Sequence, residues 1–237
     1  MKVCVVVPTY NERENIGPLL ARIRKVTVPD LQVLFVDDSS PDGTADEIRE
    51  EMRDDKSIHL LVRDSKKGIG TAHMEGFAES IKTLGADIIL EMDADLQQPP
   101  EKIPELVAAV EAGADVAVAS RKIPGGGTSG WGLWRRTVSS GANRYARFVL
   151  GIPVKDCTSG FRALNRRAAN TLAESNALAA EFFFQVASLY LLKKRGMKMV
   201  EVPFVFGERA AGKSKLSGGE IGSFFVGVLK LRFSSIG

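Results

Sequence analysis

Cysteine and histidine are scarce in this 237-residue sequence, which contains two of each. Cys4 and Cys157 are too few for a disulfide framework, so we expect two reduced thiols, as in a cytosolic protein. His59 and His73 lie outside the acidic motifs described below, which argues against a zinc site. Chemistry that depends on disulfides or on zinc is therefore not expected.

Long apolar runs, repeats and low-complexity tracts are also absent. No apolar run reaches the roughly 20 residues of a transmembrane helix, and no signal peptide is recognisable, so we expect no segment that crosses a bilayer. The basic residues are scattered among glycine, serine and apolar residues without an RNA- or DNA-binding signature, so nucleic acid is not an expected partner. With 44% hydrophobic residues, the sequence predicts one soluble globular unit with a sizeable core.

The net charge of +3 hides a strong asymmetry between the two halves of the chain. Residues 1–120 contain 13 basic and 23 acidic residues, a net charge of −10, whereas residues 121–237 contain 19 and 6, a net charge of +13. The first half is suited to a metal ion and the second to anions, such as an anionic lipid head group at a membrane surface. Ordinary solvated faces are the alternative interpretation.

Apolar runs and helical patterns alternate along the first half, which predicts an α/β fold with a mostly parallel sheet flanked by helices. The expected strands lie near 3–7, 32–36, 58–62, 87–92 and 116–120, and the expected helices near 16–26, 44–54, 70–84 and 100–112. The pattern changes after Arg121. We then expect a glycine-rich loop at 124–132, helices near 135–150 and 182–195, a strand near 199–206, a Gly/Lys/Ser loop at 207–218 and a last helix.

The segment from Ile88 to Gln97 is an apolar run that ends in two carboxylates and an amide. Asp93, Asp95 and Gln97 occupy alternate positions, so they converge on one side if the chain stays extended past Met92. Three oxygen-bearing side chains suit a hard cation such as Mg²⁺ or Mn²⁺, with substrate phosphates and water completing its shell. A solvated turn is the alternative interpretation of an isolated D-x-D.

Polar groups also follow two other apolar runs. Residues 3–7 lead into Pro8-Thr9-Tyr10-Asn11-Glu12, and residues 33–36 lead into Asp37-Asp38. Open α/β sheets bind ligands at the edge where the carboxyl ends of their parallel strands meet. We therefore expect one ligand site at this edge.

Six motifs occur in order along nearly the whole chain, from about residue 3 to about residue 230. They are V-V-P-T-Y-N-E-R-E-N, V-D-D-S-S-P-D-G-T, M-D-A-D-L-Q-Q-P-P-E, S-R at 120–121, T-S-G-F-R-A at 158–163 and G-E-R-A-A-G-K-S-K-L at 207–216. Together they resemble the dolichyl-phosphate (polyprenyl-phosphate) mannosyltransferases, which are inverting glycosyltransferases of GT-A fold. The resemblance implies a Rossmann-like GT-A sheet with a C-terminal acceptor and lid region.

The resemblance also implies which residues bind the nucleotide sugar and a Mg²⁺ or Mn²⁺ ion. Asp95 and Gln97 match direct metal ligands, and Asp93 matches a residue that contacts sugar, ribose or metal. The positions that match the nucleotide-sugar site are Pro8, Tyr10, Glu12, Val36, Asp38, Asp93, Ala94, Asp95, Arg121, Arg209 and Lys215. The alternative roles of its N-terminal members are strand ending, packing and turn formation.

The implied acceptor is a phosphate monoester, whose second pKa of roughly 6 leaves it anionic near neutral pH. Such an acceptor attacks the sugar carbon without a general base, so the task is positioning. Arg121, Arg135 and Ser139 match residues that hold the lipid phosphate, and Asp93, Asp95 and Arg121 form the expected catalytic set. A solvated helix face is the alternative interpretation of the arginines at 135, 136, 144 and 147.

We expect a GT-A domain at 1–218, with a nucleotide and metal half at 1–120 and an acceptor half at 121–218. Within it, the loop 207–218 reads as a mobile lid that closes Arg209 and Lys215 over the diphosphate, with a passive loop as the alternative. Residues 219–237 read as an amphipathic helix at a membrane interface, with packing against the domain as the alternative. The sequence departs from the family pattern at Lys213, where an acidic residue is usual, and at Ser140, where a basic one is usual.

The resemblance implies transfer of mannose from GDP-mannose to dolichyl phosphate with inversion, giving a β-linked phosphodiester. We expect a peripheral enzyme on the cytosolic face of a membrane, with small membrane-anchoring subunits as candidate partners. The alternatives are the same chemistry with UDP-glucose, transfer to a saccharide hydroxyl with Glu181 or Glu201 as base, and an inactive nucleotide-sugar sensor.

Overall fold

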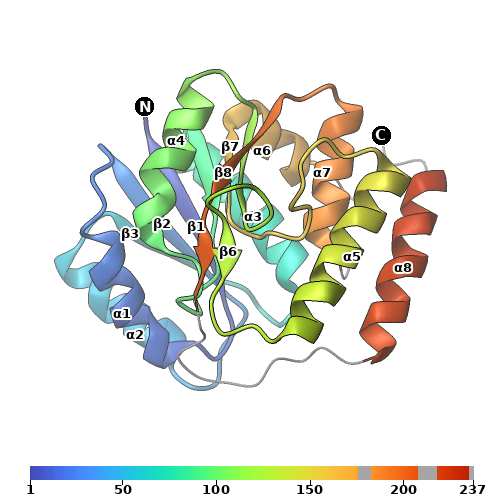
Figure 1. Ribbon diagram of the computed structural model, residues 1–237. Coiled ribbons are helices and arrows are strands. Elements are labelled where there is room, and N and C mark those ends of the chain that lie inside the picture. The colour runs from blue at the N-terminus through green and yellow to red at the C-terminus, as the bar shows by residue number, and fades with distance from the viewer. Residues whose placement is uncertain (176–182, 208–217, 235–237) are drawn as a thin grey trace.

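A central sheet of seven strands forms the core of the computed structural model, which describes residues 1–175, 183–207 and 218–234 (Figure 1). The strands follow the order β3-β2-β1-β4-β7-β5-β8. Their bounds are Val3–Thr9 for β1, Leu31–Asp37 for β2, Ile58–Val62 for β3, Ile88–Glu91 for β4, Val116–Ser120 for β5, Arg162–Asn165 for β7 and Met199–Pro203 for β8. The sheet therefore takes strands from both halves of the chain, and the division expected at residue 120 stays a prediction.

The sheet is mostly parallel, as predicted. β1 pairs in parallel with β2 and β4, β2 with β3, and β5 with β8. Within the described sheet β7 alone runs against its neighbours, between β4 and β5. The sequence analysis missed β7 because a four-residue segment that begins with arginine and ends with asparagine carries no strand periodicity of its own. Tertiary pairing forms this strand.

Helices cover both faces of the sheet (Figure 1). On one face lie α1 (Arg13–Ile23), α2 (Thr44–Asp54) and α4 (Ile103–Glu111), which continues from the 3-10 turn η1 (Pro100–Lys102). On the other lie α3 (Ile69–Lys82), α6 (Arg166–Ala173) and α7 (Phe184–Lys194). Successive side chains of β1 point to opposite faces of the sheet. Val5 packs in the hydrophobic cluster with α1, α2 and α4, and Cys4 packs in the cluster with α3, α6 and α7.

Two further helices, α5 (Leu133–Leu150) and α8 (Gly218–Phe233), lie side by side outside the second layer (Figure 1). The Tyr145 hydroxyl donates to the carbonyl of Phe225 at 3.1 Å, and the two rings are 4.6 Å apart. A small second sheet pairs β6 (Gly127–Thr128) with β9 (Val205–Phe206). No helix within the described ranges combines the length and apolar character that spanning a bilayer requires.

The first helix begins earlier than predicted. It starts at Arg13 rather than near residue 16, and it contains Pro18 in its interior. A proline costs helix stability, but Ile16, Leu19 and Ile23 are all buried against the sheet. The packing of this apolar face outweighs the local preference.

Candidate active site

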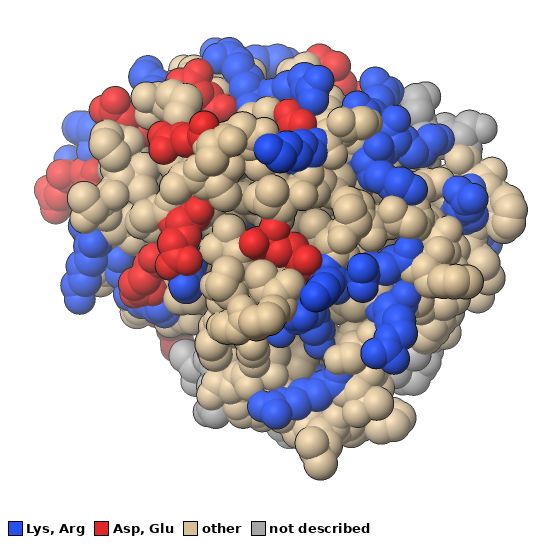
Figure 2. Space-filling model, turned by 45° about the horizontal axis from the view of Figure 1, so that its top comes forward, with Lys and Arg blue, Asp and Glu red and all other residues tan. Residues whose placement is uncertain are grey.

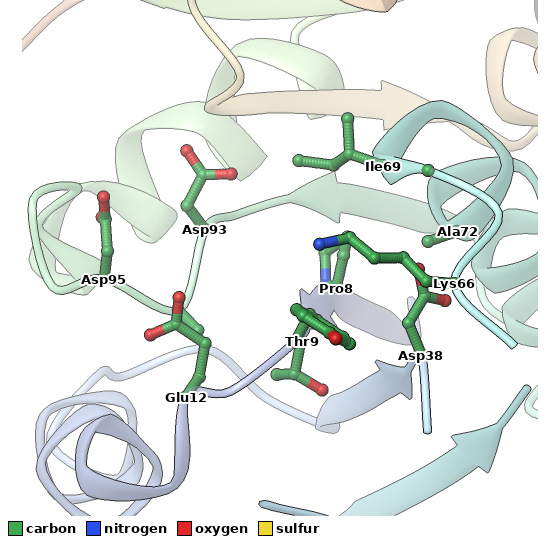
Figure 3. Close-up of a pocket in the computed structure, with 12 residues that line it drawn as sticks. Pro8, Thr9, Glu12, Asp38, Lys66, Ile69, Ala72, Asp93 and Asp95 are labelled. Carbon is green, nitrogen blue, oxygen red and sulfur yellow. The ribbon is translucent and has the colours of Figure 1, made fainter. Parts of the chain in front are cut away.

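A cavity of about 330 Å³ opens at the carboxyl ends of β1, β2 and β4 (Figure 3). Its lining residues are Pro8, Thr9, Tyr10, Glu12, Asp38, Lys66, Gly68, Ile69, Ala72, Asp93, Ala94 and Asp95. Seven of these, namely Pro8, Tyr10, Glu12, Asp38, Asp93, Ala94 and Asp95, were predicted for the nucleotide-sugar site. The parallel topology brings them together, because the loops after β1, β2 and β4 leave the same edge of the sheet.

The acidic loop after β4 is a turn and not a continued strand. β4 ends at Glu91, and Leu96 adopts a left-handed φ of 63°. Asp95 Oδ1 accepts a hydrogen bond from the Gln97 amide nitrogen at 3.1 Å. The expectation that Asp93, Asp95 and Gln97 converge by extended alternation is therefore wrong. The turn itself places the two aspartates on the cavity.

Gln97 is not among the residues that line the cavity with the two aspartates. Its side chain is buried, and its Nε2 donates to the carbonyl of Gly207 at 3.0 Å, while the Gly207 amide donates to the Gln97 carbonyl at 2.8 Å. Gln98, which the sequence analysis did not single out, supports Asp93 instead. Its Nε2 donates to Asp93 Oδ2 at 2.6 Å, and its Oε1 accepts from the Asp93 amide at 2.9 Å. A metal role for Gln97 stays a prediction.

The acidic end of the cavity has the donor chemistry of a divalent-cation site. Asp93 and Asp95 both line it, and Figure 3 shows Glu12 on the same side of the cavity. Within the described part of the chain, no three His, Cys, Asp or Glu side chains are grouped closely enough to hold a metal by themselves. Two carboxylates fit Mg²⁺ or Mn²⁺ when a bound diphosphate supplies the remaining oxygens.

The opposite end of the cavity is formed by Asp38, Lys66 and the start of α3 (Figure 3). Lys66 Nζ lies 3.6 Å from the centroid of the Tyr10 ring. Asp38 Oδ1 lies 2.9 Å from Nη1 of the buried Arg63. Burial raises the pKa of Asp38 above its usual value, while the positive charge of Arg63 opposes that rise.

Val36 was predicted to cradle the nucleotide, but its side chain does not line the cavity. It lies on β2, fully buried in the hydrophobic cluster beside α3. Successive residues of a strand point to opposite faces of the sheet, and Val36 points to the face that α3 covers. Only the loop after β2 reaches the edge of the sheet where the cavity lies. The residue from this strand end that lines the cavity is Asp38.

Arg121 follows β5 directly and is held by a buried aspartate. Its Nε and Nη2 donate to the two carboxylate oxygens of Asp156 at 2.7 Å each, and its Nη2 also donates to Thr158 Oγ1 at 3.0 Å. Burial alone would raise the pKa of Asp156. The hydrogen bonds and charge of Arg121 outweigh it, so the pKa lies below its usual value. Arg121 is thus fixed in place before any ligand arrives.

Other basic residues gather around Arg121. The Arg135 guanidinium stacks 3.9 Å from the centroid of the Trp131 ring, and Arg121 lies 5.5 Å from the same ring. Lys122 Nζ donates to Ser140 Oγ at 3.1 Å, which places a cation beside position 140. Burial, together with the charges of Arg121 and Arg136, lowers the pKa of Lys122, while Asp156 opposes the shift.

Ser139 lies on the same helix as Arg135, and its carbonyl accepts from Asn143 Nδ2 at 2.9 Å. The Asn143 side chain in turn accepts from the amide of Cys157 at 2.6 Å, next to Asp156. Arg121 thus follows β5, and Arg135 and Ser139 lie on α5. The loop around Asp156 hydrogen-bonds both to Arg121 and to Asn143 of α5. On the face that Figure 2 shows, lysine and arginine gather on the right, and the acidic side chains lie mainly at the left and centre.

Two segments connect the acidic cavity to the basic group. Gly207 forms two hydrogen bonds with Gln97. The centroid of the Phe206 ring, one residue earlier, lies 5.4 Å from Cζ of Arg121. A Cβ at Gly160 would lie 3.8 Å from Asp93 Oδ2, so the loop that begins at Asp156 closes against the acidic turn. The acidic turn and the basic group around Arg121 therefore lie next to each other in the fold.

Several predicted features fall outside the described residues. Arg209, Lys215 and Lys213 all lie in 208–217, so the lid stays a prediction. The sequence analysis also missed Asp156, Lys66, Gln98 and Arg63. Asp156 carried a signal, because acidic residues are rare in the basic second half, but nothing in the sequence revealed its burial beside Arg121.

Comparison with known proteins identifies close relatives. Residues 4–173 match the family model described as Glycosyl transferase family 2. The chain is 40% identical to the polyprenol monophosphomannose synthase of Mycolicibacterium smegmatis, with 93% of this chain and 83% of the relative covered. It is 40% identical to the undecaprenyl-phosphate mannosyltransferase of Micrococcus luteus, with 97% and 93% covered. It is 37% identical to the dolichol-phosphate mannosyltransferase of Pyrococcus furiosus, with 98% of this chain but only 64% of that protein covered.

Solved structures confirm the predicted GT-A fold. The mannosyltransferase PcManGT from Pyrobaculum calidifontis, solved with GDP-Man and Mn²⁺, has a TM-score of 0.61 at 19% identity, over 90% of this chain and 58% of that one. Glucosyl-3-phosphoglycerate synthase from Mycobacterium tuberculosis has a TM-score of 0.69 at 18% identity, over 98% and 79%. The family model covers most of the chain and the relatives cover nearly all of it, so this chain belongs to glycosyl transferase family 2.

Proposed function

We propose that this protein transfers mannose from GDP-mannose to a polyprenyl phosphate, with inversion at the sugar carbon. The observation that carries the proposal is the continuity between an acidic cavity and a preformed basic group, joined through Gly207 and Gly160. Such a site suits two anionic substrates, one bound through a metal and one bound by arginines. The names of the relatives supply the sugar and the lipid class.

The cavity is the proposed donor site. Asp93 and Asp95 would hold Mg²⁺ or Mn²⁺ together with the donor diphosphate, and the ion would supply stabilisation of the charge on the leaving group. Gln98 keeps Asp93 oriented toward the cavity through two hydrogen bonds. The nucleoside would then lie at the other end of the cavity, in contact with Tyr10, Lys66 and Asp38.

The basic group is the proposed acceptor site. Arg121 and Arg135 offer charge-assisted hydrogen bonds to a phosphate monoester, and Ser139 lies on the same helix as Arg135. Asp156 orients the Arg121 guanidinium through two hydrogen bonds and so holds it beside the proposed position of the acceptor phosphate. Because the phosphate is already anionic near neutral pH, its oxygen attacks the sugar carbon directly from the side opposite the diphosphate, which inverts the configuration.

We further propose that the protein works peripherally at the cytosolic face of a membrane. Bulky apolar side chains are exposed along α5 and at the end of α8, at Leu133, Trp134, Phe148 and Phe233. Basic residues flank them on the same helices. Apolar side chains with basic neighbours are typical of surfaces that enter a lipid interface. Small membrane subunits remain candidate partners, and the loop 207–218 is the proposed lid.

The acceptor chemistry is tested by offering several acceptors to the purified protein in detergent with labelled GDP-mannose and Mn²⁺. We expect label in the lipid product with polyprenyl phosphate and none with the matching polyprenol or with a methyl mannoside. The anomeric configuration of the product, measured by NMR, should be β. Transfer to the alcohol or the saccharide at a comparable rate would show instead a general base and a hydroxyl acceptor, with Glu201 the first residue to substitute.

A further inference from the structure

Arg63 is a buried arginine that lies beside the donor cavity without lining it. It follows the last residue of β3, and its side chain is 1% exposed. Arginine is almost never buried to this depth unless its charge and hydrogen-bonding groups are satisfied. The partners of Arg63 therefore show which parts of the structure it holds.

The first set of partners lies at the end of β2. The backbone nitrogen of Arg63 donates to the carbonyl of Asp37 at 2.8 Å, and its carbonyl accepts from the Ser39 hydroxyl. The side chain reaches the next residue, with Nη1 at 2.9 Å from Asp38 Oδ1. Main chain and side chain of Arg63 together fix the turn that carries Asp38 into the cavity.

The second set of partners lies at the start of α3. Arg63 Nη2 donates to Thr71 Oγ1 at 2.6 Å, and Nη1 donates to the carbonyl of Gly68 at 3.4 Å. Arg63 Nε lies 3.4 Å from Glu75 Oε2, one turn further along the helix. Gly68 begins the helix at a φ of 99°, without a side-chain cap of its own. The guanidinium thus holds the first turn of α3 through the Gly68 carbonyl and the Thr71 hydroxyl.

These two sets of partners form one wall of the cavity. Asp38 stands on one side of Arg63, and Gly68, Ile69 and Ala72 stand on the other. Lys66, which also lines the cavity, lies in the short segment between Arg63 and Gly68. A planar guanidinium with five fixed donors sets the spacing of both groups more rigidly than a flexible ammonium can.

We propose that Arg63 is a positioning residue for the nucleoside end of the donor, an inference that rests on the proposed function. Figure 3 shows the wall with Asp38 and Ile69 at the end of the cavity opposite Asp93 and Asp95. A donor whose diphosphate lies at the two acidic residues directs its nucleoside toward this wall. Arg63 sets the distance between Asp38 and the start of α3, and so determines whether the base and ribose fit between them.

The charge of Arg63 gives it a second effect on the same wall. Burial raises the pKa of Asp38, and the nearby carboxylates of Asp37 and Glu75 raise it further. Arg63 and the backbone hydrogen bond from Lys67 act in the opposite direction. Arg63 therefore favours the ionised carboxylate, which is the form that accepts hydrogen bonds from the N–H groups of a base or the hydroxyls of a ribose.

The proposal is tested by comparing two probes on Arg63→Met, namely GDP and inorganic diphosphate, each with Mn²⁺ in a calorimeter. We expect GDP to bind about tenfold or more weakly, while diphosphate binds as it does to the wild type, because only the nucleoside wall is altered. In transfer assays the donor KM should rise with kcat within about threefold. On acidification, the variant should lose GDP affinity at a higher pH than the wild type. Arg49→Met, at an exposed arginine of α2, is the matched control and should leave all values unchanged.

Equal GDP affinity in Arg63→Met and the wild type would overturn the proposal, and so would an equal loss for GDP and diphosphate, which marks general damage to the site. Should Arg63→Met fail to fold, Thr71→Val removes a single partner of the guanidinium and should weaken GDP alone by a smaller factor. Failure of the wild type itself to bind GDP would instead overturn the proposed donor.

Discussion

Three charged side chains of the candidate site are each held in place by a polar or charged partner. Asp93 is oriented by Gln98, Arg121 by Asp156 and Asp38 by Arg63. In each pair one member reaches the site and the other is buried behind it. The members that reach the site follow strands and were predicted from the motifs. Gln98 lies five residues from Asp93 in the same motif, whereas Asp156 and Arg63 come from other parts of the chain, where no local pattern reveals their partners.

Asp95 should be required for metal-dependent donor binding. Asp95→Ala removes one of the two carboxylates proposed to hold the metal ion, so we expect Mn²⁺-dependent GDP binding to weaken about tenfold or more, with the fold retained. Calorimetry and circular dichroism measure the two effects. Asp46→Ala, at an exposed carboxylate of α2, should bind like the wild type. Unchanged binding in Asp95→Ala would remove this residue from the metal site.

Arg121 should matter for stability as well as for transfer. Arg121→Ala strands the fully buried Asp156 carboxylate, so we expect a loss of about 3–5 kcal/mol in the free energy of unfolding, measured in urea. Arg121→Gln with Asp156→Asn keeps polar partners without a buried charge and should recover much of that loss. The double variant should still bind GDP but transfer poorly. Normal transfer by it would take Arg121 out of the acceptor site.

His73 should make stability depend on pH. Burial, aided by the charge of Arg162, lowers its pKa to about 3. Below the unfolded pKa of about 6.5 the unfolded chain binds a proton that the folded one does not, so stability falls by about 1.4 kcal/mol per pH unit. The advantage of the wild type over His73→Leu in the free energy of unfolding should therefore shrink by about 2 kcal/mol between pH 7 and pH 5. A constant difference across this range would show that folding leaves the pKa of His73 unchanged.

At the scale of elements, the sequence predicts best where a segment carries its own periodicity. The expected strands at 58–62 and 116–120 and the expected helix at 44–54 match β3, β5 and α2. The antiparallel strand β7 was missed, because its pairing with β4 and β5 depends on the whole sheet. The acidic turn after β4 was misjudged for a related reason, since the left-handed Leu96 cannot be recognised from its residue type.

Two helix glycines should respond in opposite ways to alanine. A Cβ at Gly76 on α3 would overlap Cγ1 of Val6 and lie 3.0 Å from Cγ2 of Val36, whereas a Cβ at Gly141 on α5 meets nothing within 4 Å. Gly141→Ala should stabilise the protein by up to about 1 kcal/mol through helix propensity. Gly76→Ala should be less stable than Gly141→Ala by about 1–3 kcal/mol, because it forces α3 away from the sheet. Urea unfolding measures both, and equal stabilities would contradict the close packing of α3.

At the scale of the whole molecule, the acidic and basic halves meet along one sheet. Strands β7 and β8 of the basic half pair with β4 and β5 of the acidic half, and Gly160 and Gly207 of the basic half lie against the acidic turn after β4. The charge asymmetry of the sequence predicted two partners of different kinds but not their adjacency. That adjacency follows from the strand order, which places β7 between β4 and β5.

The exposed apolar side chains of α5 should bind membranes. Trp134 and Phe148 are 76% and 89% exposed, with arginines on the same helix. We expect the protein to cosediment with vesicles containing phosphatidylglycerol, less so at high salt, and Trp134→Ser with Phe148→Ser to weaken this by about tenfold or more. Val62→Ser, on the edge strand β3, should bind like the wild type. Equal binding by the double variant would place the membrane surface elsewhere.

The measurement that tests the central claim most directly is transfer of labelled sugar to polyprenyl phosphate from GDP-mannose and, separately, from UDP-glucose, each with Mn²⁺ and with a chelator. We predict a mannosyl lipid from GDP-mannose that disappears with the chelator, and no product from UDP-glucose. Product from UDP-glucose alone would contradict the proposed donor. Full transfer in the presence of the chelator would contradict the role given to Asp93 and Asp95.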